Sequence, residues 1–287
     1  MIIWLASYPK SGNTWLRAFI SALIYSEDGI MDKSLWTKIP QFPLIENFDD
    51  LIFDKDVFYL KKKEHAYTLF EQLINAQYKL NLDNKIKIVK THFINCKVNQ
   101  FSFTDENNTL GTIHIVRDPR NVISSLKNHY DLNNYESACK FLFNDQEWLV
   151  KKENKELLHA PILLGSWGSH YNMWKQYKKN YLLIKYENLV NNSFHEFEKV
   201  KNYLENIMNI KIEQEKFENA IKSTSFDKLK IMEKKNEFYE NAIDKNNQNL
   251  TFFKFGSKNK WENLLDKNLA DNIVKKFKKE MKELDYI

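Results

Sequence analysis

The chain has 287 residues, of which 43% are hydrophobic and 14% are aromatic, and its formal net charge is +5. This apolar content excludes a disordered chain, and two cysteines are too few for a disulfide scaffold or a cysteine-based zinc cluster. The basic residues are interleaved with acidic ones along the whole chain, so we expect a solvated surface and no nucleic-acid partner.

Targeting and membrane signals are absent from the sequence. No apolar run approaches the ~20 residues of a membrane span. The N-terminal Met1–Ser7 is too short for a signal peptide. We therefore expect a soluble cytoplasmic protein with no membrane span, in which Cys96 and Cys139 are inert thiols.

The apolar segments predict strands that alternate with helices. Short buried runs predict strands at 2–7, 86–90, 111–116 and 182–186. Apolar residues at helical spacing predict helices at 14–25, 65–80, 194–204 and 265–281, and another from Asn121 onward. This order favours a single domain over residues 1–287 with a P-loop-like, three-layer α/β/α fold and a mostly parallel central sheet.

Two stretches interrupt this alternation. Residues 30–85 are aromatic and irregular, and Trp36, Phe42 and Phe48 either shape an acceptor pocket or pack in the core. Residues 233–260 are rich in lysine and asparagine and poor in apolar anchors. Such a stretch indicates a long mobile loop, which is a candidate lid over a site.

Polar motifs follow the predicted strands, where parallel sheets bind ligands. After the first strand, a loop containing Lys10 and Gly12 leads into a helix. Free backbone N–H groups and the helix dipole favour an anion there. Lys10 precedes Gly12, which differs from a nucleotide P-loop. Taken alone, the Lys-Ser-Gly sequence is also compatible with an ordinary strand–helix connection.

Arginine is rare, because only Arg17, Arg117 and Arg120 are found among 43 basic residues. Proteins favour arginine where a planar, bidentate fork must grip an anion. Arg117 ends a predicted strand and Ser125 lies on the next helix, so the two offer a fork and a hydroxyl to one phosphate. A salt bridge from Arg117 to a neighbouring acid is the alternative.

A histidine follows the second predicted strand, in the sequence Lys90-Thr91-His92. Close to an anion loop, such a histidine can act as a general base, or it can be a hydrogen-bonded structural residue. No pair among the remaining histidines has metal-ligand spacing, so we expect structural roles for them. They are His65, His114, His129, His159, His170 and His195.

Together these motifs resemble the cytosolic sulfotransferase family, whose members use 3′-phosphoadenosine 5′-phosphosulfate (PAPS). The similarity covers residues 8–15, 90–92 and 117–125, continues at 165–174, 183–189, 224–226 and 252–261, and is weakest over 26–85 and 130–160. It implies a sulfotransferase that transfers a sulfuryl group to the hydroxyl of an alcohol, phenol or sugar. It also implies release of 3′,5′-phosphoadenosine (PAP), no metal requirement and, since family members are often dimers, a homodimer as one option.

The resemblance implies a role for each matching residue. The loop Lys10, Ser11, Gly12, Asn13, Thr14 and Trp15 would hold the phosphosulfate, and Arg117 and Ser125 would grip the 3′-phosphate under Lys254, Phe255 and Gly256. The adenine would lie between Trp15 and Phe226, beside Tyr186, Thr224 and Ser225. His92 would be the base, while Lys10 and Lys90 stabilise charge.

The sequence departs from the family pattern in two segments. Asn13 stands where threonine is common, which leaves the backbone N–H group in place. Lys254-Phe255-Gly256 replaces the more usual Arg-Lys-Gly, so one positive charge is lost beside the 3′-phosphate.

Two other functions stay open from the residues. One is a nucleotide-dependent kinase, which the order of Lys10 and Gly12 and the lack of an aspartate for magnesium disfavour. The other is a nucleotide-binding pseudoenzyme, which the substitution at Phe255 favours and an intact His92 disfavours.

Overall fold

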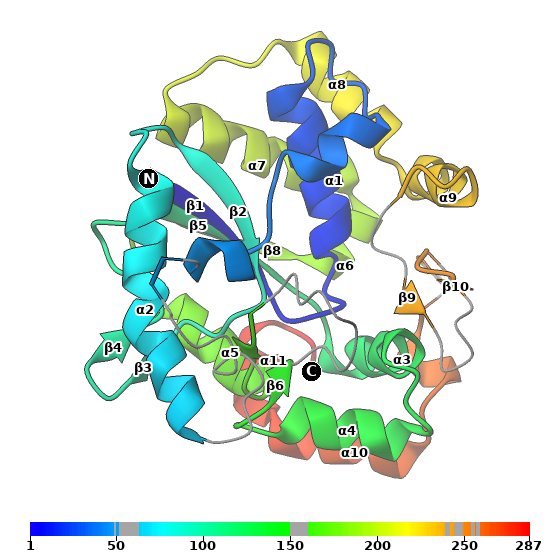
Figure 1. The fold of residues 1–287 in the computed structure, drawn as a ribbon. Coiled ribbons are helices and arrows are strands. Elements are labelled where there is room, and N and C mark those ends of the chain that lie inside the picture. Colours follow the sequence, from blue (N-terminus) through cyan, green and yellow to red (C-terminus); the bar gives the residue numbers. More distant parts are fainter. Residues whose placement is uncertain are drawn as a thin grey trace. The chain divides into compact units, whose positions relative to one another are not determined.

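Four apolar segments form a central sheet in the order β2-β1-β5-β8 (Figure 1). The strands are β1 (Ile2–Ser7), β2 (Lys87–Thr91), β5 (Thr109–Val116) and β8 (Tyr181–Lys185). Every residue of β1 is buried, as the run of apolar residues predicts. β1 and β2 are parallel, with Ile2 opposite Lys87 and Ala6 opposite Thr91. The predicted α/β fold, a mostly parallel sheet flanked by helices, is confirmed.

The computed structural model describes residues 1–48, 50–51, 63–149, 160–238, 242–243, 249–253, 256 and 259–287. The α-helices are α1 (Asn13–Tyr25), α2 (Lys63–Asn81), α3 (Pro119–His129), α4 (Tyr135–Phe143), α5 (Trp167–Lys175), α6 (Tyr186–Asn191), α7 (Ser193–Met208), α8 (Gln214–Ser223), α9 (Phe226–Lys234), α10 (Lys267–Lys276) and α11 (Lys278–Glu283). Short 3₁₀ helices are η1 (Lys33–Thr37), η2 (Ile45–Phe48) and η5 (Trp261–Asn263). Short antiparallel strand pairs are β3 (Lys97–Val98) with β4 (Phe101–Ser102), β6 (Trp148–Leu149) with β7 (Ile162–Leu163), and β9 (Ala242–Ile243) with β10 (Asn249–Leu250). Across these described ranges, no helix combines the length and apolar character needed to cross a bilayer.

By its internal contacts the chain divides into two units. The first comprises Met1–Tyr8, Pro40–His114 and Asn144–Leu182. Aromatic rings form its core: Trp4 lies 5.5 Å from Phe42 and 5.1 Å from Phe103 between ring centroids. Phe42 and Phe48 are fully buried there, so core packing accounts for both of them.

The second unit comprises Pro9–Ile39, Ile115–Phe143 and Leu183–Ile287. Its α1 and α7 both pack against α8, and Phe19 stacks on Phe197 at 3.9 Å between centroids. A second group of helices, α3, α4 and α10, packs together in the same unit. Most of the predicted site residues lie in this unit, including those on α1 and α3 and in the loops before these helices.

Three details differ from the sequence predictions. The last helix is two helices, α10 and α11, because Phe277 leaves the helical conformation at φ −115° and ψ 28°. β8 ends at Lys185, and Tyr186 begins α6. The stretch 233–260 contains the β9–β10 pair and the end of α9, and part of it lies outside the described residues.

Candidate active site

The loop between β1 and α1 has a backbone that requires glycine at its centre. Gly12 has φ +100°, and a Cβ atom added there would lie 2.5 Å from Cδ2 of Tyr186. Lys10 also adopts a left-handed conformation, with φ +66°. The chain therefore turns sharply twice and passes directly under the Tyr186 ring before α1 begins at Asn13.

The loop leads into a helix N-terminus that suits an anion. The first N–H groups of any α-helix lack intrahelical partners and carry the positive end of the helix dipole. The first turn of α1 contains no acidic residue that would cancel this field. Ser11 is fully buried, and within the described part of the chain its hydroxyl has no hydrogen-bond partner. Because buried hydroxyls are normally paired, this one fits the oxygen of a bound anion.

Arg117 joins the predicted sites for the two ends of a donor nucleotide. Its Nη1 atom donates a hydrogen bond to the backbone carbonyl of Lys10 at 3.1 Å and lies 3.5 Å from Ser125 Oγ. Its guanidinium carbon lies 4.1 Å above the ring of Tyr186. The structure thus brings Arg117, Ser125, Lys10 and Tyr186 together, with the guanidinium stacked on the Tyr186 ring.

Asn259 is part of this cluster, although no sequence signal predicts it. Its side-chain amide nitrogen donates to the carbonyl of Asn121 at 3.0 Å and to Ser125 Oγ at 3.3 Å. Its amide oxygen accepts from the Ser124 hydroxyl at 2.5 Å. Asn259 is buried, so it fixes the face of α3 that carries Ser125.

The predicted adenine residues fall into two contact groups. Trp15 makes edge contacts with Tyr186 and Phe197, at 6.2 and 5.6 Å between centroids. Gly256 lies against Phe226, since an added Cβ atom would be 2.7 Å from its ring. The sandwich of adenine between Trp15 and Phe226 therefore stays a prediction.

The remaining late residues have local roles as well. The Thr224 hydroxyl donates to the carbonyl of Ala220 at 2.6 Å, which closes the end of α8. Ser225 occupies the N-cap position of α9. Lys254 and Phe255 lie outside the described residues.

Lys10 contacts an aromatic residue from the late segment. Its Nζ atom lies 3.8 Å from the centroid of the Phe252 ring, a distance typical of a cation–π interaction. Phe253, the next residue, contacts Phe226 at the start of α9, at 5.9 Å between ring centroids.

In the first unit, His92 follows β2 and is oriented by Ser7 at the end of β1. Its Nδ1 atom lies 2.7 Å from the Ser7 carbonyl oxygen and 3.2 Å from Ser7 Oγ. A carbonyl oxygen can only accept, so Nδ1 carries the proton and Nε2 of the neutral ring has the lone pair. Half-buried His92 is thus in the tautomer that a general base needs.

Lys90 lies two residues before His92 in the same unit. It is buried, and its backbone bonds to the carbonyl of Pro40 and the N–H of Phe42, at 2.9 and 2.8 Å. The loop 40–42 therefore pairs with the end of β2 and fixes where the Lys90 side chain begins.

Two other histidines are buried and neutral. Burial lowers the pKa of His170 to about 3, and burial followed by the charge of His170 lowers the pKa of His114. His114 Nδ1 lies 2.7 Å from the Tyr181 hydroxyl. The bond to Tyr181 agrees with the structural role predicted for His114, whereas within the described part of the chain neither ring nitrogen of His170 has a hydrogen-bond partner.

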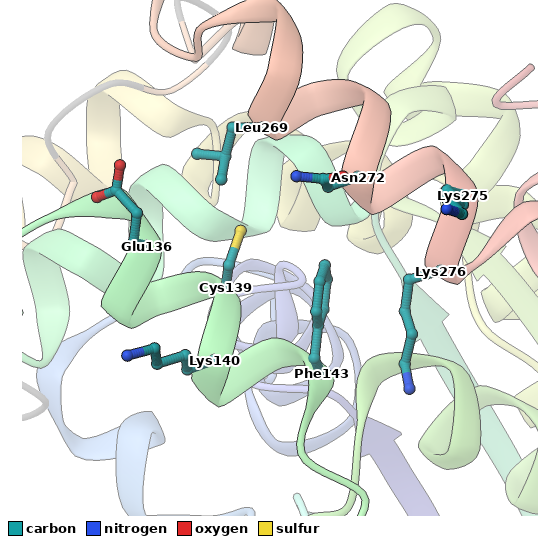
Figure 2. A pocket seen from close by; sticks show the side chains of 8 residues that line it. All are labelled: Glu136, Cys139, Lys140, Phe143, Leu269, Asn272, Lys275 and Lys276. Atoms are coloured by element: carbon teal, nitrogen blue, oxygen red, sulfur yellow. The ribbon is translucent and has the colours of Figure 1, made fainter.

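An open groove of about 520 Å³ lies between α4 and α10 and contains none of the predicted site residues. Cys139 and Phe143 of α4 and Leu269 of α10 line it, together with Lys140, Lys275 and Lys276 (Figure 2). Burial raises the pKa of the Cys139 thiol to about 12 and that of Cys96 to about 11. Both thiols are therefore weak nucleophiles, as predicted. In the part of the chain that the structure describes, no group of three His, Cys, Asp or Glu residues is arranged to hold a metal ion.

Comparison with known proteins gives one consistent result. The family model described as the sulfotransferase domain matches residues 2–285. Sulfotransferase 1E1 of Mus musculus is 26% identical over 97% of this chain and 83% of its own length. Sulfotransferase 2A1 of Macaca fascicularis is 22% identical over 98% of this chain and 84% of its own.

Two solved structures share the fold. A mouse sulfotransferase complexed with PAP has a TM-score of 0.60 and 19% identity, and the alignment covers 99% of this chain and 84% of that one. Retinol dehydratase in complex with retinol and PAP has a TM-score of 0.56 and 17% identity, over 98% of this chain and 81% of that one.

Proposed function

Because the chain belongs to the sulfotransferase family, we propose that it transfers the sulfuryl group of PAPS to a hydroxyl of a small-molecule or glycan acceptor. The acceptor oxygen forms a bond to sulfur, and the bond from sulfur to the 5′-phosphate oxygen breaks. PAP leaves with the bonding electrons, and the acceptor proton passes to a base. The family match supports the prediction that this chain is a sulfotransferase enzyme with PAPS as its donor substrate.

One observation carries this proposal: Arg117 bonds to the Lys10 carbonyl while lying over Tyr186 and close to Ser125. PAPS has one anionic group at its 5′ end and another at its 3′ position. The anion loop and the Arg117 fork belong to one contact network. This network therefore offers a partner to each of the two anionic groups of PAPS. An ordinary strand–helix connection explains neither the fork nor the buried Ser11 hydroxyl, which has no hydrogen-bond partner among the described residues.

At the 5′ end, the backbone N–H groups of Ser11 to Thr14 bind the phosphosulfate oxygens, and Trp15 borders the adenine. Lys10 neutralises the bridging oxygen as the bond to sulfur breaks. At the 3′ end, Arg117 and Ser125 bind the phosphate. Sulfuryl transfer is an in-line displacement in which positioning and charge stabilisation dominate. The sulfuryl group carries less charge than a γ-phosphoryl group, so the mechanism uses lysines without a metal ion.

At the acceptor, His92 accepts the hydroxyl proton on Nε2. The Ser7 carbonyl supports this role, because it holds the other ring nitrogen as a donor. Lys90 contributes positive charge toward the transferring group. The acceptor oxygen is thereby made nucleophilic only as it approaches sulfur.

Adenine lies beside Tyr186 and Thr224 in the proposal, with Ser225, Phe226 and Gly256 on the same side. Lys254 and Phe255 complete the cover over the 3′-phosphate. We propose a single sulfotransferase domain over residues 1–287, which the family match to residues 2–285 supports. The resemblance to cytosolic enzymes supports a cytoplasmic location, and the family's frequent dimers leave a homodimer open to test.

Mass spectrometry of products tests the function directly. The purified chain is incubated with PAPS and a mixed panel of alcohols, phenols and sugars, and sulfated product appearing together with PAP is expected. Thermal shift measurements run in parallel. Stabilisation by ATP and magnesium beyond that by PAP favours the kinase, and tight PAP binding without any sulfated product favours the pseudoenzyme.

A further inference from the structure

The segment Leu284–Tyr286 is fastened to the ends of two strands that carry donor-binding residues. The Tyr286 hydroxyl donates to Glu187 Oε2 at 3.0 Å, and its backbone carbonyl accepts from Arg120 Nη2 at 2.7 Å. The Lys185 ammonium donates to the Leu284 carbonyl. Lys185 and Glu187 flank Tyr186, and Arg120 follows Arg117 by three residues, so the segment touches the neighbours of both residues.

Glu187 bridges this segment to the turn after β5. Its Oε1 atom accepts the backbone N–H of Asp118 at 3.0 Å, while Oε2 accepts from Tyr286. Asp118 directly follows Arg117, and Glu187 directly follows Tyr186. The two partners of the Arg117–Tyr186 stack are therefore each one residue away from the hydrogen bond between Glu187 and Asp118.

Asp118 and Arg120 stiffen the same turn. Asp118 is the N-cap of α3, and its side chain accepts from the Arg120 backbone N–H at 2.9 Å. The Arg120 guanidinium pairs with both oxygens of the Asp118 carboxylate and lies 4.2 Å above the ring of Trp261. Glu187 holds the backbone N–H of Asp118 on the other side, so the residue that directly follows Arg117 is fixed from two directions.

We propose that Glu187 and Tyr286 are positioning residues, which set the direction of the Arg117 fork and thereby the preference for nucleotides that carry a 3′-phosphate. This inference rests on the proposed function, because it concerns the 3′-phosphate site. In the hydrogen bonds given above, Glu187 and Tyr286 bind the turn after β5, which carries Arg117. Their loss should therefore weaken binding at the 3′ end of the nucleotide more than at the 5′ end.

The electrostatics of Glu187 agree with this role. Burial raises the pKa of its carboxyl, and the positive charge of Arg117 opposes that rise. A carboxyl in such surroundings depends on its hydrogen-bond donors to stay ionised. The Tyr286 hydroxyl is one of these donors, so its loss weakens the acceptor that holds Asp118.

Two variants test the role, each with both nucleotides. Tyr286→Phe removes one oxygen and keeps the ring, and Glu187→Gln keeps the shape and removes the charge. Isothermal titration calorimetry gives the Kd of PAP and of adenosine 5′-phosphate, which lacks the 3′-phosphate. We expect PAP to bind about tenfold more weakly to either variant. Each variant weakens the hydrogen bond between Tyr286 and the Glu187 carboxylate, and losing a bond to a charged group costs about the free energy of a tenfold change in Kd. Binding of adenosine 5′-phosphate should change less than about twofold.

Steady-state kinetics and a control complete the test. The KM for PAPS should rise in both variants while kcat stays near the wild-type value, because His92 and Lys10 are unchanged. Tyr78→Phe, at a tyrosine that is 63% exposed, should change neither constant. Circular dichroism verifies the fold of each variant. If one variant fails to fold, the other is enough to decide the test.

The outcomes separate the two claims. Preference of the wild type for PAP, with the same preference in Tyr286→Phe and Glu187→Gln, overturns the positioning role and leaves the proposed function intact. Equal loss of both nucleotides also overturns it, since that result indicates general damage. A wild type that does not prefer PAP over adenosine 5′-phosphate overturns the proposed function and this inference with it.

Discussion

Replacing Gly12 by alanine tests the geometry of the loop on which donor binding depends. The added Cβ would lie 2.5 Å from the Tyr186 ring, about 1 to 1.5 Å inside an ordinary carbon–carbon contact of about 3.5 to 4.0 Å. The φ of +100° is also unfavourable for alanine. Either the loop or the Tyr186 ring must move. The Arg117 guanidinium stacks on this ring, so a shift of the ring also shifts Arg117.

The magnitude follows from these two causes. Forcing a residue with a Cβ into a left-handed conformation costs about 1–2 kcal/mol, and overpacking costs about 1–3 kcal/mol. The free energy of unfolding should therefore fall by roughly 2–5 kcal/mol. PAP should bind at least about tenfold more weakly, which corresponds to ~1.4 kcal/mol, because the displaced ring no longer supports Arg117.

Gly29→Ala is the matched control in the same unit. Gly29 has φ +86°, and its added Cβ would lie 2.1 Å from the carbonyl oxygen of Lys216. We expect a comparable loss of stability in chemical denaturation, with PAP affinity within about twofold of wild type when titrated well below the unfolding temperature. The reasoning is refuted if Gly12→Ala retains both wild-type stability and wild-type PAP affinity, or if Gly29→Ala loses PAP binding as severely.

Three further predictions concern single residues. His92→Ala should lower kcat by about 10²-fold or more while PAP binding by calorimetry stays unchanged; wild-type turnover would remove His92 as the base. Asn259→Ala should weaken PAP binding by about threefold to tenfold, because the Asn121 carbonyl and the Ser124 and Ser125 hydroxyls lose a buried partner; unchanged affinity in calorimetry contradicts this. Lowering the pH from about 7 to about 5 should lower the free energy of unfolding by roughly 2 kcal/mol through His170. Its pKa is about 3 in the folded protein, so below its ordinary pKa the unfolded chain binds more protons; an equally steep fall in a His170→Asn variant argues against it.

The strands and most of the helices could be predicted from local pattern. The run at 2–7 is apolar throughout and ends at a proline-containing loop, and β1 has these bounds. The predicted last helix was wrong at one point, because the apolar spacing continues through Phe277 while the backbone does not. A spacing pattern records which face is buried and carries no information on a break that preserves that face.

The sequence points to some residues of the candidate site and misses others, and the difference between the two groups has a physical reason. Lys10, Arg117 and His92 each follow a strand, so a rule about strand ends finds them. Asn259 and Tyr286 act through contacts with residues more than 90 positions away. Both lie in segments without periodicity at their own positions, and only the folded chain brings their hydrogen bonds together.

The three arginines show how far residue type alone can guide such an analysis. Their scarcity predicted forks for anions, and the structure shows a further contact for each of them. Each lies over an aromatic ring: Arg17 over Trp36 at 5.6 Å, Arg117 over Tyr186 at 4.1 Å and Arg120 over Trp261 at 4.2 Å. The Arg120 guanidinium also forms a bidentate ion pair with the Asp118 carboxylate. A lysine ammonium can occupy the place of a guanidinium above a ring, but it cannot also form a planar, bidentate pair with a carboxylate. This combination explains why a chain rich in lysine has arginine at the turn after β5, where Arg117 lies over Tyr186 close to Ser125 and Arg120 pairs with Asp118.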